Sequence, residues 1–152
     1  MFQFFYIYFF IYYFKIKNLL AGGVFYMKTL KSLSALADCN IAILVKVLAN
    51  MVYNKEDNRP IETNGTKYVI VCPMDDFNQY TVKIVTDDLP IITNEELQQR
   101  LSNFEFTYCI FDGFAAKNYV NSFTGKAAFT CSAKSIRLLT EEEVKTLLSS
   151  SI

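Results

Sequence analysis

Cysteine and aspartate are the residues of this sequence whose types could support catalysis or metal binding, and histidine is absent. Without histidine, the chain cannot build a Ser-His-Asp or Cys-His nucleophile, a histidine-ligated zinc site or histidine acid–base chemistry. Cys39, Cys72, Cys109 and Cys131 are 33, 37 and 22 positions apart, so no C-x-x-C pair predicts a four-thiolate zinc site. Three of them lie in or beside apolar strands, where we expect small buried hydrophobes.

The carboxylate pairs Asp75-Asp76 and Asp87-Asp88 have two interpretations. Paired carboxylates can bind a metal ion or act in acid–base catalysis. Both pairs follow expected strands, however, where aspartate forms turns by hydrogen-bonding its own backbone, and we favour that role. No G-x-x-x-x-G-K phosphate loop is present either. We therefore expect a protein that is not an enzyme and that uses no cofactor and no metal.

Residues 1–26 differ in composition from the rest of the chain, because they contain 12 of the 24 aromatic residues. The apolar run of residues 1–14 is shorter than the roughly 17–25 residues of a membrane-spanning helix. Its lysines follow the run, whereas a secretory signal places positive charge before it. We interpret residues 1–26 as the translation of an AT-rich DNA region that lies upstream of the gene, with the true start of translation at Met27. A short membrane anchor is the alternative interpretation.

The remaining 126 residues have 13 basic and 15 acidic groups, a net charge of −2. That length suits one domain with a core of its own. A slightly acidic chain argues against wholesale electrostatic binding to nucleic acid, although a local groove can still be positive. Without a credible secretory signal, we expect reduced cysteines and a cytoplasmic protein.

The local patterns predict a mainly β domain over residues 27–140 with short helices, followed by a C-terminal helix over 141–152. Strands are indicated at 41–53, 67–74, 80–86, 104–111 and 126–139, the last bent at Ser132-Ala133, with a polar loop over 54–66. Helices are indicated at 28–37 and after the capping boxes at Thr93 and Thr140. The alternation over 104–111 predicts that Phe104, Phe106 and Tyr108 are core residues, and Tyr68 is expected to be buried.

The order of strands and the single inserted helix predict a five-stranded OB-like Greek-key barrel with a helix between strands 3 and 4. Residues 41–139, with segments such as KYVIV, YTVKIV and GKAAFTCSAKSIRLL, resemble the small single-stranded-DNA-binding (SSB-like) OB-fold proteins of Gram-positive plasmids, conjugative elements and phages. The resemblance implies a non-enzymatic protein that binds single-stranded DNA, with RNA as the alternative, and assists replication or transfer of a mobile element.

Mapping that family's binding surface onto this chain nominates nine residues. They are the cations Lys55, Arg59, Lys67, Lys83 and Lys117 and the aromatic residues Tyr53, Phe77, Tyr80 and Tyr119. Such proteins stack bases on aromatic rings and follow the backbone with cations. The competing interpretation is that these lysines are the solvated outer face of a sheet and protect its edges.

Two other functions remain open. The amphipathic terminal helices and the acidic balance favour a small β-barrel module that binds a protein partner or a second copy of the chain. A membrane-anchored accessory protein is the third hypothesis, and it requires residues 1–26 to be part of the protein.

Overall fold

The computed structural model describes residues 29–38 and 40–150. Residues 1–26, with the interpretations given for them, and Cys39 lie outside the described residues. The helices are α2 (Leu33–Ala37), α3 (Asn94–Ser102) and α4 (Glu141–Ser149). The strands are β1 (Thr29–Leu30), β2 (Ala42–Tyr53), β3 (Pro60–Cys72), β4 (Asn78–Ile84), β5 (Thr107–Asp112), β6 (Ala115–Val120), β7 (Ala127–Ser132) and β8 (Ser135–Leu138).

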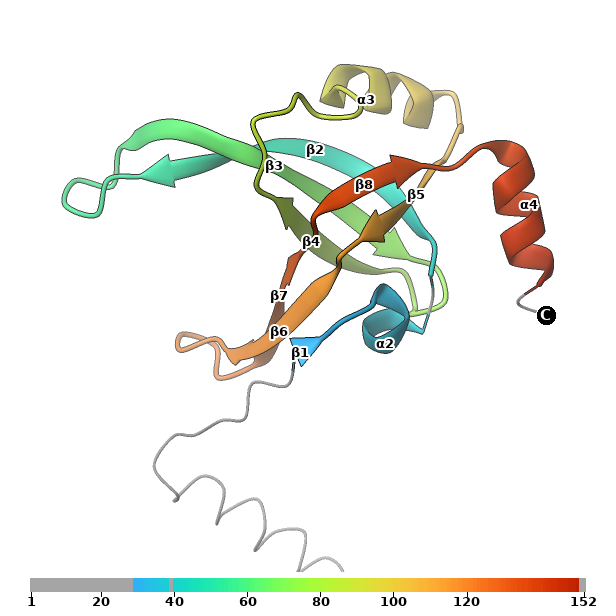
Figure 1. Ribbon diagram of the computed structural model, residues 1–152. Coiled ribbons are helices and arrows are strands. Elements are labelled where there is room, and N and C mark those ends of the chain that lie inside the picture. Colours follow the sequence, from blue (N-terminus) through green and yellow to red (C-terminus); the bar gives the residue numbers. More distant parts are fainter. Residues whose placement is uncertain (1–28, 39, 151–152) are drawn as a thin grey trace, which may run out of the picture.

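All eight strands belong to one open mixed sheet in the order β1-β6-β7-β4-β3-β2-β5-β8 (Figure 1). The consecutive strands β3 and β4 form an antiparallel hairpin. Among the strand pairs within residues 29–38 and 40–150, only the contact between β4 and β7 is parallel. The long hairpin of β2 and β3 and the shorter one of β6 and β7 project from the same side of the molecule, while α4 lies on the other side (Figure 1).

The predicted five-stranded OB-like Greek-key barrel with a helix between strands 3 and 4 is wrong, because the described chain forms an eight-stranded open sheet. One cause is that residues 115–120, which lie outside the five strands expected from the sequence, form β6 after a turn at Gly113, whose φ is 62°. A second break separates β7 from β8, at the bend expected from the sequence. The two strands on either side of Gly113 pair with different neighbours. β5 pairs with β2 and β8, whereas β6 pairs with β1 and β7.

Two predicted boundaries also change. Residues 60–66, expected to belong to a polar loop, form the first half of β3 because they pair with the end of β2. Pro60 is compatible with this assignment because it is the first residue of its strand. Residues 29–30, expected to be helical, form β1 by pairing with Lys117 and Ala116, and the helix starts only at Leu33.

The main hydrophobic cluster lies on one face of the sheet, and Ile43 of β2 and Val69 of β3, which alternate with its members, are buried on the other face. Leu44 of β2, Ile70 of β3 and Val82 of β4 are fully buried, and Tyr68 is buried as expected. Leu97 of α3 is also fully buried in the same cluster. The helix thus contributes an apolar side chain to the core of the sheet.

Helix α3 covers the edge of β2 where that strand is bulged. The register of β2 against β3 shifts between Leu44 and Lys46. At this shift, the Val47 N–H donates to Asn94 Oδ1 at 3.0 Å, and Gln98 Nε2 donates to the Val45 carbonyl at 2.9 Å. These bonds satisfy strand groups that β5, which pairs only with residues 42–44, does not reach.

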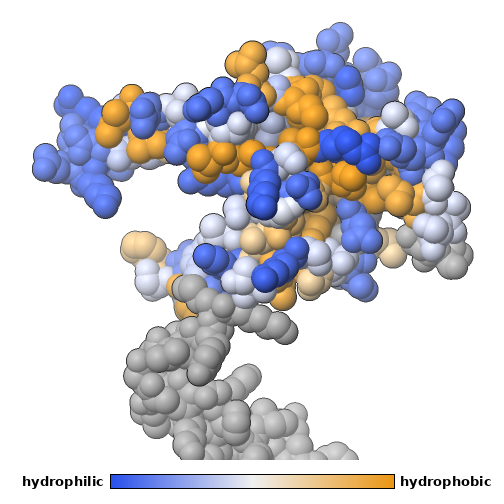
Figure 2. Space-filling view, viewed as in Figure 1, coloured by the Kyte–Doolittle hydropathy of each residue, from blue (hydrophilic) through white to orange (hydrophobic). Residues whose placement is uncertain are grey.

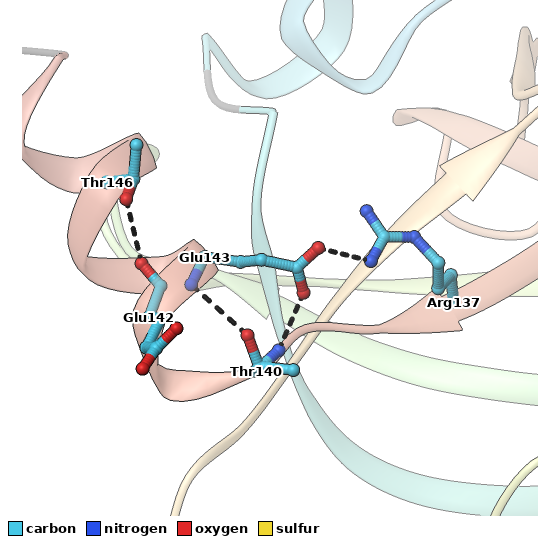
Figure 3. Close-up of polar contacts among 5 residues, drawn as sticks. All are labelled: Arg137, Thr140, Glu142, Glu143 and Thr146. Atoms are coloured by element: carbon cyan, nitrogen blue, oxygen red, sulfur yellow. Dashed lines mark hydrogen bonds and ion pairs between the residues drawn. The ribbon is translucent and has the colours of Figure 1, made fainter.

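Helix α4 is held to β8 by a capping box and one ion pair (Figure 3). The Glu143 N–H donates to Thr140 Oγ1, and the Thr140 N–H donates to Glu143 Oε2 at 2.8 Å, as the sequence predicted. Arg137 of β8 donates to Glu143 Oε1 at 2.7 Å. Both hydrogen bonds favour the ionised carboxylate, so the pKa of Glu143 lies below its usual value. The bond from the Thr140 backbone has the larger effect and the bond from Arg137 the smaller one.

Candidate nucleic-acid interface

Two predicted lysines meet on the outer face of the sheet. Lys67 of β3 lies directly opposite Lys83 of β4. Their chain neighbours Tyr68 and Val82, which also pair with each other, are buried in the core. Because successive side chains of a strand point to opposite faces, both lysine side chains lie on the face away from the core.

The same face continues across the sheet to two further lysines. Lys46 of β2 pairs with Val69, which is two residues from Lys67 on the same strand. Lys83 pairs with Ser132 of β7. Thr130, which lies two residues before Ser132 on the same strand, pairs with Lys117 of β6. We call Lys46, Lys67, Lys83 and Lys117 the lysine face.

The strands that carry the lysine face are almost free of acidic residues. Among β2, β3, β4, β6 and β7, the one acidic residue is Glu62, in the projecting part of β3. The other acids of the described chain lie in turns and loops, in helices, or at Asp112 of β5. Within residues 29–38 and 40–150, none of the four lysines has an ion-pair partner. Their positive charge is therefore available to a ligand.

Aromatic residues lie on the two projecting hairpins beside this face. We define the long arm as residues 49–65 and the short arm as residues 118–129. Tyr53 and Tyr119, both nominated from the sequence, are exposed on the long and the short arm, and Phe123 at the tip of the short arm is 98% exposed. Figure 2 shows an open recess between the two arms. Tyr119 follows Lys117 by two positions in β6 and so shares the face of that lysine.

The backbone at the base of the long arm requires glycine at position 65. Gly65 has a φ of 86°, and a Cβ at this position would lie 2.0 Å from the carbonyl oxygen of Ile84. The side-chain amide of Asn50 donates to the neighbouring Asn64 carbonyl at 2.8 Å. Asn64 and Gly65, expected to belong to the polar loop of residues 54–66, therefore lie at an irregularity inside the β2–β3 pair, from which the arm projects.

The two remaining cations on the long arm lie at its tip. Lys55 and Arg59 are exposed in the turn between β2 and β3, and Arg59 Nε lies 3.6 Å from Asp57 Oδ2. This turn also contains Glu56, so the tip carries both signs of charge. Lys55 and Arg59 therefore belong to a separate, electrostatically mixed surface and not to the lysine face.

Phe77 and Tyr80 do not join the other nominated residues. Phe77 lies in the turn between β3 and β4, at the end of these strands opposite the long arm. Tyr80 is half-buried against the core and donates a 2.6 Å hydrogen bond to Asp75 Oδ2. Burial, first, and then the bond to Asp75 raise the pKa of the Tyr80 hydroxyl above its ordinary value. This ring is held in the protein and is not presented as a platform for a base.

Two members of the surface were missed in the sequence. Lys46 is the one charged residue in the apolar run of residues 41–49, and a lone charge in a strand indicates a solvent-facing position. Phe123 lies in a turn, and no local pattern distinguishes a turn phenylalanine that packs from one that projects.

The prediction that Phe104 and Phe106 are core residues is wrong. Their side chains are 87% and 57% exposed, whereas Thr107 is buried. The strand begins only at Thr107, and within it Thr107 and Cys109 are buried whereas Tyr108 is half-buried, so the alternation has the opposite phase to the one expected and Tyr108 is not a core residue either. Phe104 instead follows the C-terminal cap of α3 with a φ of 58°.

The buried cysteines fit the predicted structural role. Cys72, Cys109 and Cys131 are buried in the core. Burial, assisted by the proximity of Cys72, raises the pKa of Cys109 to about 12, and burial raises that of Cys131 to about 11. Among the described residues, no group of three or more histidine, cysteine, aspartate or glutamate side chains is placed to hold a metal ion.

A groove of about 330 Å³ lies at the base of the long arm, between β2, β3 and the segment of residues 86–90. Asp87 and Asp88 are on its rim. Thr86 Oγ1 and Asp88 Oδ2 are 3.2 Å apart, and the Asp88 N–H donates to the same threonine oxygen. The structure thus places Asp88 in the local turn geometry expected from the sequence.

In the part of the chain that the structure describes, no helix is long and apolar enough to cross a membrane. Comparison with protein-family models gives no match. No curated protein matches the chain. No solved structure matches it either, so neither family nor fold relationship is assigned by comparison.

Proposed function

We propose that this protein is a non-enzymatic binder of single-stranded nucleic acid, with single-stranded DNA as its ligand. The observation that carries the proposal is the lysine face: four lysines on one side of the sheet, in strands almost free of acids and without ion-pair partners among the described residues. The resemblance of the strand sequences to small single-stranded-DNA-binding proteins supports a role in replication or transfer of a mobile element.

The net charge of −2 over residues 27–152 does not oppose this proposal. Because the acids lie mostly outside the strands and the four lysines of the lysine face lie within them, the positive potential is local to one face. Association with a polyanion depends on this local potential, and each neutralised phosphate contributes by releasing counterions.

The aromatic residues favour a single strand over a duplex. Bases in a single strand are free to stack, and a base stacked on an aromatic ring contributes about 1–3 kcal/mol. Tyr119 lies on the same face as Lys117, and Tyr53 and Phe123 are exposed on the arms. Rings and cations on adjacent surfaces provide the two kinds of contact that a single strand uses.

The proposal is tested by fluorescence anisotropy with a labelled oligo-dT. We expect binding at low salt, with a slope of log K against log salt of about −3, since each of four lysines contributes about 0.7 for a single strand. Oligo-rU and a duplex of the same length are the comparison ligands. Tighter binding of duplex than of oligo-dT contradicts the single-strand assignment, and no binding to any of the three contradicts the function.

Charge reversal tests the surface itself. Lys83→Glu should weaken oligo-dT binding by about 10–30-fold, because it removes one phosphate contact and adds a repulsive one. Lys145→Glu on α4 makes the same change in net charge away from the lysine face and should change affinity by less than about twofold. Equal effects of the two variants would show that net charge, and not the lysine face, determines binding.

A second function, self-association or association with a protein partner, is favoured by the exposed rings of Phe104 and Phe106. Exposed aromatic residues are enriched at protein interfaces. Sedimentation of the protein and of a Phe104→Ser/Phe106→Ser variant tests it: a dimer that the double substitution converts to monomer supports it, and a wild-type monomer at all concentrations removes self-association.

A further inference from the structure

The centre of the lysine face has an unfavourable arrangement in the free protein. Lys67 and Lys83 are directly opposite on adjacent antiparallel strands. Side chains so placed have Cβ atoms about 4.5–5.5 Å apart, and like charges in this position destabilise a sheet. Both lysines are half-buried, and no described carboxylate pairs with either of them.

The flanking positions differ in chemistry on the two sides of this pair. On the β2 side, Lys67 is opposite Leu48, which is 39% exposed. On the β7 side, Lys83 is in register with Ser132, whose side chain is also exposed. One row across four strands therefore presents an apolar side chain, two ammonium groups and a hydroxyl.

We propose that Lys67 and Lys83 form a phosphate clamp, in which both ammonium groups and the Ser132 hydroxyl bind one phosphate of the nucleic-acid strand while Leu48 contacts the adjacent sugar. This inference rests on the proposed function and specifies how one phosphate is bound. The anion lies between two charges that repel each other in its absence, so binding relieves the repulsion. The clamp lowers the stability of the free sheet and raises its affinity for a phosphate.

The other two members of the lysine face provide a matched comparison. Lys46 is opposite Val69, and Lys117 is opposite Thr130 and Thr29, so neither has a like charge across the strand pair. Removing the charge of Lys46 or Lys117 takes away a phosphate contact without relieving any repulsion. Removing the charge of Lys67 or Lys83 takes away a phosphate contact and also relieves the repulsion between the two lysines.

The test combines thermal unfolding at low salt with oligo-dT anisotropy for Lys67→Gln, Lys83→Gln, Lys46→Gln and Lys117→Gln. All four variants should lose affinity, by about fivefold at about 0.1 M salt. Only Lys67→Gln and Lys83→Gln should also raise the Tm of the free protein, by about 1–4 °C. An unchanged or lower Tm for both of these variants would overturn the clamp.

Inorganic phosphate separates the clamp from nucleic-acid binding in general. At matched ionic strength, phosphate should raise the Tm of the wild-type protein more than chloride does, and this difference should disappear in Lys67→Gln/Lys83→Gln. Wild-type binding to oligo-dT without a phosphate effect on the Tm would refute the clamp and leave the proposed function intact. Absence of oligo-dT binding alongside an intact phosphate effect would refute the function and leave an anion site.

Discussion

The exposed residue Phe77 occupies a backbone position that favours glycine. Asp76 and Phe77 have φ values of 50° and 56° in a turn closed by the Asn78 N–H, which donates to the Asp75 carbonyl at 2.8 Å. Two consecutive residues at positive φ define a type I′ turn, whose second central position usually holds glycine. Phe77 therefore strains the hairpin locally, although its ring is 66% exposed and adds little to the core.

Replacing Phe77 with glycine should stabilise the protein by about 1 kcal/mol, because an L-residue in the left-handed region costs roughly 1–2 kcal/mol and part of that gain is lost to the flexibility of glycine. Urea denaturation measures the change. Phe123→Gly is the control, since Phe123 is a turn phenylalanine that is still more exposed, at 98%, but lies outside the set of positive-φ residues. A loss of stability in Phe77→Gly would show that the ring makes contacts that outweigh the strain.

At the scale of elements, one carboxylate of helix α4 links the start of the helix to strand β8. Glu143 accepts both from the Thr140 N–H and from Arg137 of β8 (Figure 3). Both donors favour the ionised form, so the pKa of Glu143 is lowered in the folded protein. A lowered pKa contributes stability above the unfolded-state value, and this contribution is lost as the pH falls through the folded-state value.

The substitution Glu143→Gln should therefore destabilise α4 at neutral pH and lose its effect in acid. Hydrogen exchange of the α4 amides, measured for both proteins across the acid range, checks this. At neutral pH, exchange should be faster in the variant, and the difference should vanish below the folded-state pKa of Glu143. A difference that persists unchanged at low pH would mean that the bond to Arg137 does not depend on ionisation.

At the scale of the whole molecule, one core joins strands that are distant in sequence. Cys72, Cys109 and Cys131 come from β3, β5 and β7, and all three are buried in it. Only a thiolate reacts rapidly with a disulfide reagent. Because burial holds the pKa of Cys109 at about 12 and that of Cys131 at about 11, few thiolates form in the folded state.

These thiols should report global unfolding. In a Cys39→Ser background, which removes the thiol outside the described residues, we expect almost no reaction with Ellman's reagent at about pH 8 in buffer and complete reaction in urea. The urea midpoint of reactivity should coincide with that of circular dichroism. Reaction of one thiol at lower urea concentration would identify a strand that separates before the rest of the sheet.

The sequence by itself determined the features that depend on near neighbours. Thr93 and Thr140 begin their helices as predicted, because a cap requires only residues within one turn. The alternation over residues 67–72 likewise predicted a strand with Tyr68 inside. The strand count failed because residues 115–120 form an additional strand, β6, and because β7 and β8 are separate strands. Phe104 was wrongly placed in a strand, because it follows the C-terminal cap of α3 with a positive φ.

Tertiary structure alone decided which residues share a surface. Lys67 and Lys83 are 16 positions apart, and Lys117 is farther still; they lie on one face because β4 pairs with β3 on one side and with β7 on the other. The sequence carries the alternation that turns each lysine outward. It does not carry the partner of each strand, because pairing is chosen by long-range contacts across the whole core, and the lysine face exists only once those contacts are made.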